Sequence, residues 1–194
     1  MNSLKISKII DESIQTKELL KQLISNIEAV VNMVLKTLQN GRKILLCGNG
    51  GSAADAQHIA CELVAKLQKK RKSLPAIALT TNTSLLTAIS NDASFEEVFA
   101  RQIEGLGKSG DTLIAISTSG KSPNVLKAVE TAKSMEINTI GLTGMNGDKL
   151  VQQVDLNIKV PSSNTQRIQE AHILIGHIIC EMVEQKTTNP SAEG

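Results

Sequence analysis

Residues 114–124 read Ile114-Ala-Ile-Ser-Thr-Ser-Gly-Lys-Ser-Pro-Asn124, an apolar run that ends in three hydroxyl residues and a glycine. The serine before the proline suits a helix cap, and the proline suits the first helical position, where its missing N–H costs nothing. A cap uses one hydroxyl, but four gather here: Ser117, Thr118, Ser119 and Ser122. Hydroxyls and free N–H groups at a positive helix end suit a phosphate dianion. We therefore interpret residues 117–122 as a phosphate cradle; the alternative is an ordinary capped helix after a strand.

Strand-like and helix-like segments alternate on both sides of the phosphate cradle. The strand-like apolar runs are residues 43–47, 76–79, 112–116, 139–142 and 156–160. The helical patterns are residues 53–67, 84–89, 95–106, 124–135, 148–152 and 165–185. This alternation predicts an α/β fold, a three-layer α-β-α sandwich around a five-stranded parallel sheet. Ligands of such sheets bind at the carboxyl ends of the strands, where the cradle lies.

A long helical segment precedes the first strand. Residues 4–39 contain no glycine or proline, and apolar residues recur there at helical spacing. The pattern predicts one long helix or two abutting helices, with more apolar surface than a lone domain needs. We expect part of it to contact another subunit. The predicted organisation is one domain over residues 1–194, with an oligomerisation segment (1–40), an α/β core (41–186) and a flexible tail (187–194).

Composition excludes several classes of protein. The chain has 194 residues, 41% apolar and 21% charged, with a net charge of +2, which is typical of one globular domain. Phe95 and Phe99 are its only aromatic residues, so base stacking on nucleic acid is not expected. Cys47, Cys61 and Cys180 are odd in number and widely spaced, which favours a reducing compartment. With no signal peptide or membrane-length apolar run, we expect a cytoplasmic protein that neither spans nor binds a membrane.

A glycine-rich turn follows the first predicted strand. Gly48-x-Gly50-x-x-Ala53 has the spacing of a dinucleotide fingerprint, but that use requires an acidic residue at the end of the next strand. The next strand ends Leu79-Thr-Thr-Asn82, without an acid. The glycines are better explained by the close approach of backbone N–H groups to a smaller ligand.

Polar residues on two predicted helices are candidates for chemistry. His58 and Glu62 stand at i and i+4, on one helix face just after the glycine-rich turn. Such a pair is ordinarily a surface hydrogen bond, but it can also bind Zn²⁺ or act as acid and base. The terminal helix carries Gln169, His172 and His177 among apolar residues, and polar groups there are either outward-facing or functional. The basic run 66–72 is interpreted as a solvated helix end and loop, with an anion-binding patch as the alternative.

Three separate stretches carry a resemblance to a known family. They are CGNGGSAADAQHIACE (residues 47–62), ISTSGKSPN (116–124) and RIQEAHILIGH (167–177). Together they resemble the sedoheptulose 7-phosphate isomerases, or phosphoheptose isomerases, of the sugar-isomerase (SIS) domain superfamily. The resemblance runs from the first helix to about Glu184 and implies a flavodoxin-like SIS fold. It also implies a cytoplasmic homotetramer with sites near subunit interfaces, which makes D-glycero-D-manno-heptose 7-phosphate for lipopolysaccharide core or capsule.

The resemblance also implies which residues act. By matching motifs, Glu62 and His177 are the acid–base pair that moves a proton through an enediol(ate), and one Zn²⁺ per subunit is implied. The implied zinc ligands are His58, Glu62, Gln169 and His177. The implied substrate-binding residues are Asn49, Gly50, Gly51, Glu62, Asn91, Asp92, Ser117, Thr118, Ser119, Ser122 and Gln169. Lys121 is a local variation within the cradle.

The spacing of Gln169 and His177 limits how both could bind one zinc ion. Gln169 and His177 are eight residues apart, so on one helix they are separated by about 12 Å along its axis. Either the helix starts irregularly near Gln169, or one of the two residues serves a neighbouring subunit's site.

A rival reading comes from related SIS proteins without catalysis, which bind the bacterial replication initiator or sense sugar phosphates. The initiator-binding subgroup lacks the residues that match Glu62 and His177. Both are present here, which favours the enzyme.

Overall fold

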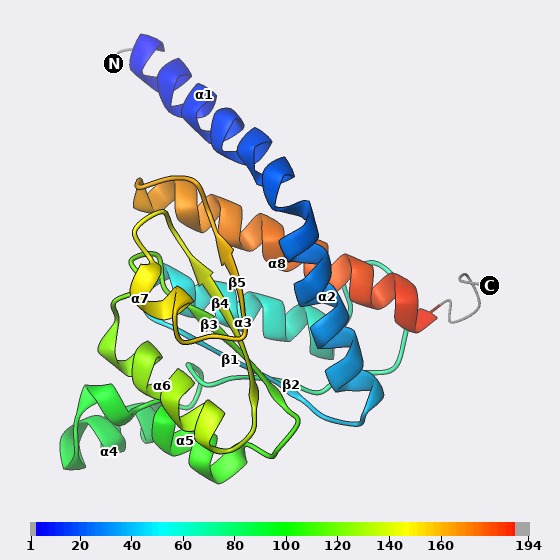
Figure 1. The fold of residues 1–194 in the computed structure, drawn as a ribbon, viewed down its shortest axis with the longest axis vertical. Coiled ribbons are helices and arrows are strands. Elements are labelled where there is room, and N and C mark those ends of the chain that lie inside the picture. Colours follow the sequence, from blue (N-terminus) through cyan, green and yellow to red (C-terminus); the bar gives the residue numbers. More distant parts are fainter. Residues whose placement is uncertain (1–2, 189–194) are drawn as a thin grey trace.

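The computed structural model describes residues 3–188, which form an α/β fold around one parallel sheet (Figure 1). Its strands are β1 (Ile44–Gly48), β2 (Ala76–Ala78), β3 (Thr112–Ile116), β4 (Asn138–Thr143) and β5 (Leu156–Lys159). Their order across the sheet is β2-β1-β3-β4-β5, and every neighbouring pair is parallel. This is the flavodoxin-like order, whose switch point lies between β1 and β3. The predicted fold class is confirmed.

Helices cover both faces of the sheet. They are α1 (Ser3–Leu19), α2 (Ile24–Gln39), α3 (Gly51–Val64), α4 (Thr83–Asp92), α5 (Ala100–Leu106), α6 (Pro123–Ser134), α7 (Asp148–Val151) and α8 (Thr165–Thr188). Two 3₁₀ turns, η1 (Leu20–Leu23) and η2 (Phe95–Glu97), precede α2 and α5. None of the helices within residues 3–188 is long and apolar enough to cross a lipid bilayer.

The layers follow from the alternation of side chains along each strand. Ile44 and Leu46 of β1 pack in one core with α2, α3 and α8, whereas Leu45 and Cys47 pack in a second core with α5 and α6. Both sets are fully buried, because successive side chains of a strand point to opposite faces. The result is the three-layer sandwich predicted from the sequence.

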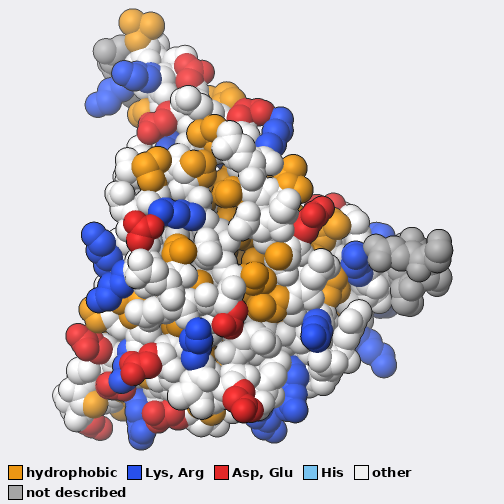
Figure 2. Space-filling view, viewed as in Figure 1, with side chains coloured by type: hydrophobic (Ala, Val, Ile, Leu, Met, Phe, Trp, Pro, Cys, Tyr) orange, Lys and Arg blue, Asp and Glu red, His pale blue; other side chains and the backbone are white. Residues whose placement is uncertain are grey.

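The N-terminal segment divides into two helices, the second of the two expected alternatives. The helix α2 buries an apolar stripe against the sheet, whereas α1 buries only Thr16 and projects from the body of the molecule (Figure 1). The exposed apolar residues of α1 are Leu4, Ile6, Ile9, Ile10 and Ile14. Figure 2 shows apolar side chains along this projection, interspersed with charged ones.

Some predicted boundaries were wrong. The helix predicted over residues 53–67 ends at Val64, and the one predicted over 95–106 is interrupted between η2 and α5. The helix α8 continues to Thr188, so the first two residues of the predicted tail are helical. The remaining tail residues, 189–194, lie outside the described residues.

Candidate active site

Two loops meet at the switch point of the sheet. β1 and β3 are in register to their last residues, Gly48 beside Ile116, so the glycine-rich turn and the phosphate cradle start at the same edge. Asn49 and Asn124 join them by reciprocal amide hydrogen bonds of 2.8 Å and 2.9 Å. The two motifs that the sequence placed at the strand ends are therefore one continuous surface.

The phosphate cradle starts helix α6 as predicted, with Ser122 at the cap position and Pro123 in the first turn. The Ser122 hydroxyl, however, does not cap the helix; its Oγ lies 3.1 Å from Ser117 Oγ. The Lys121 N–H donates to Ser119 Oγ at 3.2 Å. Because the hydroxyls are not used on the α6 N–H groups, the positive end of the helix remains available to an anion.

Gly120 fixes the shape of the cradle. Its φ is +61°, a left-handed conformation that suits glycine. A Cβ at this position would also collide with the backbone of Gly147, in the turn before α7. The cradle therefore requires glycine for two independent reasons.

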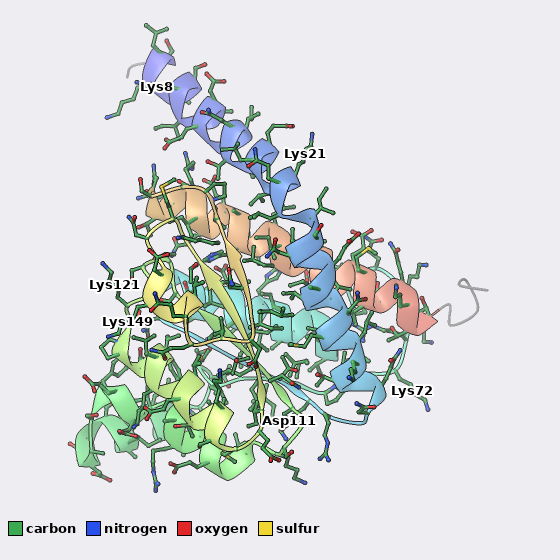
Figure 3. All side chains as sticks on the ribbon, viewed as in Figure 1. Lys8, Lys21, Lys72, Asp111, Lys121 and Lys149 are labelled. Carbon is green, nitrogen blue, oxygen red and sulfur yellow. The ribbon has the colours of Figure 1, made fainter. Side chains whose placement is uncertain are left out.

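A hollow of about 190 Å³ opens beside the cradle. Thr118, Ser119 and Lys121 form one wall of it. The other lining residues are Asn146, Ser162, Ser163, Thr165 and Ile168. Figure 3 shows Lys121 beside α7, at the opposite end of the sheet from Asp111. Sequence reasoning missed the hydroxyls of the second wall, although Ser162-Ser-Asn-Thr165 directly after the last predicted strand was a usable signal.

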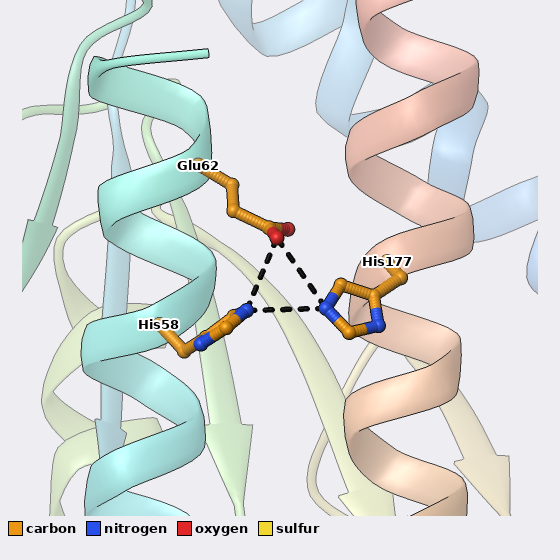
Figure 4. Close-up of side chains that lie close together, drawn as sticks. All are labelled: His58, Glu62 and His177. Atoms are coloured by element: carbon orange, nitrogen blue, oxygen red, sulfur yellow. Dashed lines mark hydrogen bonds and ion pairs between the residues drawn. The ribbon is translucent and has the colours of Figure 1, made fainter. Parts of the chain in front are cut away.

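His58, Glu62 and His177 converge between α3 and α8 (Figure 4). His58 Nε2 lies 3.1 Å from Glu62 Oε1 and 3.1 Å from His177 Nε2. His177 Nε2 is 3.3 Å from the same Glu62 oxygen. The other Glu62 oxygen, Oε2, is buried and has no hydrogen-bond partner. The His58 side chain is 51% exposed and that of His177 42%, so this cluster opens to solvent.

The geometry of this cluster suits a metal ion. Ligand atoms about 2.0–2.1 Å from a tetrahedral ion lie roughly 3.3 Å from one another, close to the three distances observed. Two imidazole nitrogens and a carboxylate oxygen are also the donor set that Zn²⁺ commonly takes. The three residues therefore fit the ion that the resemblance implied.

Gln169 lies elsewhere in the groove between the same two helices. A Cβ on Gly51 would collide with the Gln169 amide, and a Cβ on Gly176 would lie 2.7 Å from Ile59. These contacts mean that α3 and α8 run parallel, with Gln169 beside the first turn of α3 and His177 about two turns further on. Since α8 is α-helical from Thr165 onward, an irregular start near Gln169 is excluded. The Gln169 amide lies beside Gly51 at the start of α3.

Asn91 and Asp92 also lie apart from the cluster. They end α4, whose Leu86 and Ile89 pack on the core opposite α3 and α8. Both are exposed, and Asn91 Nδ2 donates to Asp92 Oδ1 at 2.8 Å. The structure therefore joins Asn49 to Asn124 beside the cradle, whereas Asn91 and Asp92 lie on the face of the sheet opposite the cluster.

Two groups beneath the cluster have shifted pKa values. Burial raises the pKa of Asp55, one turn before His58, and the charge of His58 opposes the shift. Burial also raises the pKa of the Cys180 thiol, and the neighbouring Glu62 carboxylate raises it further. Cys180 is therefore a neutral thiol under Glu62. Its contact with Glu62 depends on how α8 packs on α3, and this packing was not predicted from the sequence.

Comparisons with known proteins agree with this geometry. The SIS domain family matches residues 11–144. A phosphoheptose isomerase of Clostridium acetobutylicum is 52% identical over 180 residues, 91% of this chain and 92% of its own. One from a Nitratiruptor species is 60% identical over 151 residues, 78% of this chain and 81% of its own. The solved structure of a phosphoheptose isomerase from Francisella tularensis superposes with a TM-score of 0.92 at 40% identity, over 96% of this chain and all of that one.

Proposed function

The chain belongs to the phosphoheptose isomerase family of SIS-domain proteins, and we propose that it converts D-sedoheptulose 7-phosphate to D-glycero-D-manno-heptose 7-phosphate. This reaction is the first step towards the nucleotide-activated heptose of lipopolysaccharide core or capsule. The observation that carries the proposal is the pairing of a phosphate cradle with a carboxylate–imidazole cluster in one fold. The cradle would hold the remote phosphate, which contributes binding energy and orients the reacting carbons.

The proton transfer falls to Glu62 and His177. A ketose and an aldose are interconverted by moving a proton between adjacent carbons through an enediol(ate), which needs a base at carbon and an acid at oxygen. The Glu62 carboxylate can accept the proton from carbon, and the His177 imidazole can exchange a proton with the sugar oxygens. The two side chains are neighbours, with Glu62 Oε1 and His177 Nε2 3.3 Å apart, so one bound substrate can reach both residues.

We propose that His58, Glu62 and His177 hold one Zn²⁺ per subunit. When bound, such an ion supplies Lewis-acid polarisation of the sugar oxygens. The three ligand distances and the partly exposed imidazoles support this assignment. Gln169, on α8 two turns before His177, is the fourth residue of the site that the resemblance implies.

The proposed assembly is a homotetramer with its sites near subunit interfaces. Two features support subunit contacts: the exposed apolar face of α1, and α4, in which none of the ten described residues is buried. A neighbouring subunit that covered α4 would bring Asn91 and Asp92 towards a second chain's substrate, as their implied role requires. The cytoplasm remains the proposed compartment, supported by three unpaired cysteines within residues 3–188.

A non-catalytic role is the alternative, with the chain binding the replication initiator or sensing a sugar phosphate. The matches to phosphoheptose isomerases do not favour it. The experiment that separates the two is incubation with sedoheptulose 7-phosphate, with and without a chelator, while aldose formation is followed. We expect turnover that the chelator abolishes and Zn²⁺ restores. Binding of the sugar phosphate without turnover in the zinc-loaded protein would overturn the proposed enzyme.

A further inference from the structure

A buried ion pair lies near the C-terminal ends of α3 and α8, the two helices that carry the His58–Glu62–His177 cluster. Glu184 of α8 is 2% exposed and accepts three backbone N–H bonds, from Leu67 at 3.0 Å, Gln68 at 2.7 Å and Lys69 at 2.8 Å. Arg71 Nε lies 3.2 Å from Glu184 Oε1, and its side chain is 4% exposed. Burial alone would raise the pKa of Glu184, but the three N–H bonds and Arg71 lower it overall. The pair is therefore ionised and internal.

The other arm of Arg71 reaches the helix that carries the cluster. Its Nη2 donates to the backbone carbonyl of Glu62 at 2.7 Å, and its Nη1 to that of Leu63 at 2.8 Å. These carbonyls belong to the last turn of α3, where backbone C=O groups have no N–H partner within the helix. A guanidinium there also complements the negative end of the helix dipole. Arg71 is thus bonded to the very residue that supplies the candidate base.

The position of Glu184 on α8 matters equally. It lies seven residues after His177, so the two share a helix face and are about 10 Å apart along the axis. The chain of contacts then runs from His177 along α8 to Glu184, across to Arg71, and back to the backbone of Glu62. It joins the two helices whose side chains form the cluster.

We propose that Arg71 and Glu184 are positioning residues that fix the register of α3 against α8, and so hold His58 and Glu62 within reach of His177. The inference rests on the proposed function of the cluster. Apolar side chains between two helices allow small sliding movements, because dispersion contacts are not directional. The fork of Arg71 and the three N–H bonds of Glu184 are directional and tie both helices to one loop.

Stability alone does not explain this pair. Replacing a buried ion pair by well-packed apolar residues is often neutral or stabilising, since both charges lose hydration. This pair is bonded to the carbonyl of Glu62 and belongs in part to the helix of His177. It therefore also constrains the geometry of the cluster. It also revises the interpretation of the basic run 66–72: four of its cations are exposed lysines, whereas Arg71 points inward.

The chain offers a matched control before β3, at a buried carboxylate that contacts neither α3 nor α8. Asp111 is 1% exposed and accepts the N–H groups of Lys43 at 3.0 Å and Lys108 at 2.8 Å. Its other partner is the ammonium of Lys43, at 2.6 Å. Figure 3 shows Asp111 at the end of the sheet away from Lys121 and the cradle. Its loss should cost stability by the same mechanism without disturbing α3 or α8.

The test compares Glu184→Gln with Asp111→Asn in the full-length protein. Both keep the size of the side chain and remove its charge. We expect Glu184→Gln to lower Zn²⁺ affinity, measured by competition with a chromophoric chelator, by roughly 10–100-fold, the range usual for groups that orient metal ligands. At saturating Zn²⁺ it should lower kcat at least about tenfold with little change in KM, because the cradle is intact. Asp111→Asn should lower Tm while Zn²⁺ affinity and kcat stay within about twofold of wild type.

Arg71→Lys serves as the second variant if Glu184→Gln fails to fold. It keeps the charge, but one ammonium cannot bond both carbonyls and also pair with Glu184 as the guanidinium does, so we expect the same loss of Zn²⁺ affinity at a smaller cost in Tm. A folded variant of either kind with wild-type Zn²⁺ affinity and kcat would overturn the positioning role. The Zn²⁺ titration is independent of turnover. If the wild-type protein binds Zn²⁺ but does not isomerise the sugar, the proposed function fails, and the comparison of variants still decides this inference.

Discussion

The phosphate cradle and the His58–Glu62–His177 cluster are built in opposite ways. Six consecutive residues after β3 form the cradle, and its shape depends on one turn. The cluster joins residues 119 positions apart, and its shape depends on how α8 lies against α3. A local site fails when its own residues change, whereas an assembled site can also fail through residues such as Glu184 that touch no substrate. The two regions should therefore differ in which kinetic constant a substitution changes.

The largest effect is expected in the cluster. Glu62→Gln keeps the shape of the side chain but removes its charge and basicity, and His177→Asn removes the imidazole. Each should lower kcat by roughly 10²–10⁴-fold, the contribution usual for one acid–base group, while the sugar phosphate still binds through the cradle. Steady-state kinetics, with Zn²⁺ content measured in the same samples, tests this.

Because both residues serve one proton-transfer sequence, the double variant should be little worse than either single one. Exchange of solvent deuterium into C1 or C2 of the sugar, followed by NMR, reports the proton transfer directly. Wild-type exchange rates in both single variants would contradict the assignment of the pair and leave the cluster a binding site only.

The same contrast explains what the sequence could predict. The cradle, the glycine-rich turn and the His58–Glu62 pair are local patterns, and each lies where its motif placed it. The parallel direction of the strands follows from the alternation of strands and helices, because parallel neighbours need crossovers; their order across the sheet does not follow from it. The contact of His177 with the pair came from the family resemblance. Geometry alone did not provide it, since the register of two helices far apart in sequence is decided by tertiary packing.

Packing also accounts for the predictions that failed. The helix after the glycine-rich turn stops at Val64, three residues earlier than predicted, because the N–H groups of residues 67–69 bond to Glu184 instead of continuing the helix. Nothing in residues 53–67 signals this stop, since the acceptor is 115 or more positions away. The hydroxyls of the second wall follow the last predicted strand directly, but only the tertiary fold shows that they lie beside Thr118, Ser119 and Lys121.

A smaller effect is expected when the cradle is changed. Gly120→Val should raise KM for the sugar phosphate by about tenfold or more with a lesser change in kcat, because φ of +61° and the contact with Gly147 both exclude a side chain. Gly41→Val is the matched control: its φ is +69°, but a Cβ there meets nothing within 4 Å. Gly41→Val should lose roughly 1–3 kcal/mol of stability from strain alone, and Gly120→Val should lose more because of its contact with Gly147, both measured by urea unfolding. If Gly41→Val raised KM equally, the cradle assignment would be wrong.

The smallest effect on catalysis concerns His172, which connects the two regions. It is fully buried on α8, between Gln169 and His177, and its Nε2 lies 3.2 Å from the Thr143 carbonyl at the end of β4. Burial lowers its pKa to about 4, although the bond to Thr143 opposes the shift. Thr143 also packs against Gly147, which contacts Gly120 of the cradle. Protonating His172 should therefore destabilise both the turn that supports the cradle and the helix α8 that carries His177.

The sign of the pH effect follows from proton binding. Between about pH 6.5 and pH 4 the unfolded chain binds a proton at His172 that the folded chain does not, so the free energy of unfolding must fall as the pH falls through this window. The full loss from a shift of this size is on the order of 3 kcal/mol, complete only below about pH 4.

His172→Asn keeps an amide donor for Thr143 but cannot titrate. Urea unfolding of the metal-free proteins at pH 7 and pH 4.5 should therefore show a smaller acid loss in the variant than in the wild type, with kcat at pH 7 changed little in the zinc-loaded forms. Equal acid losses in the two proteins would mean that another group, not His172, accounts for the acid sensitivity of this fold.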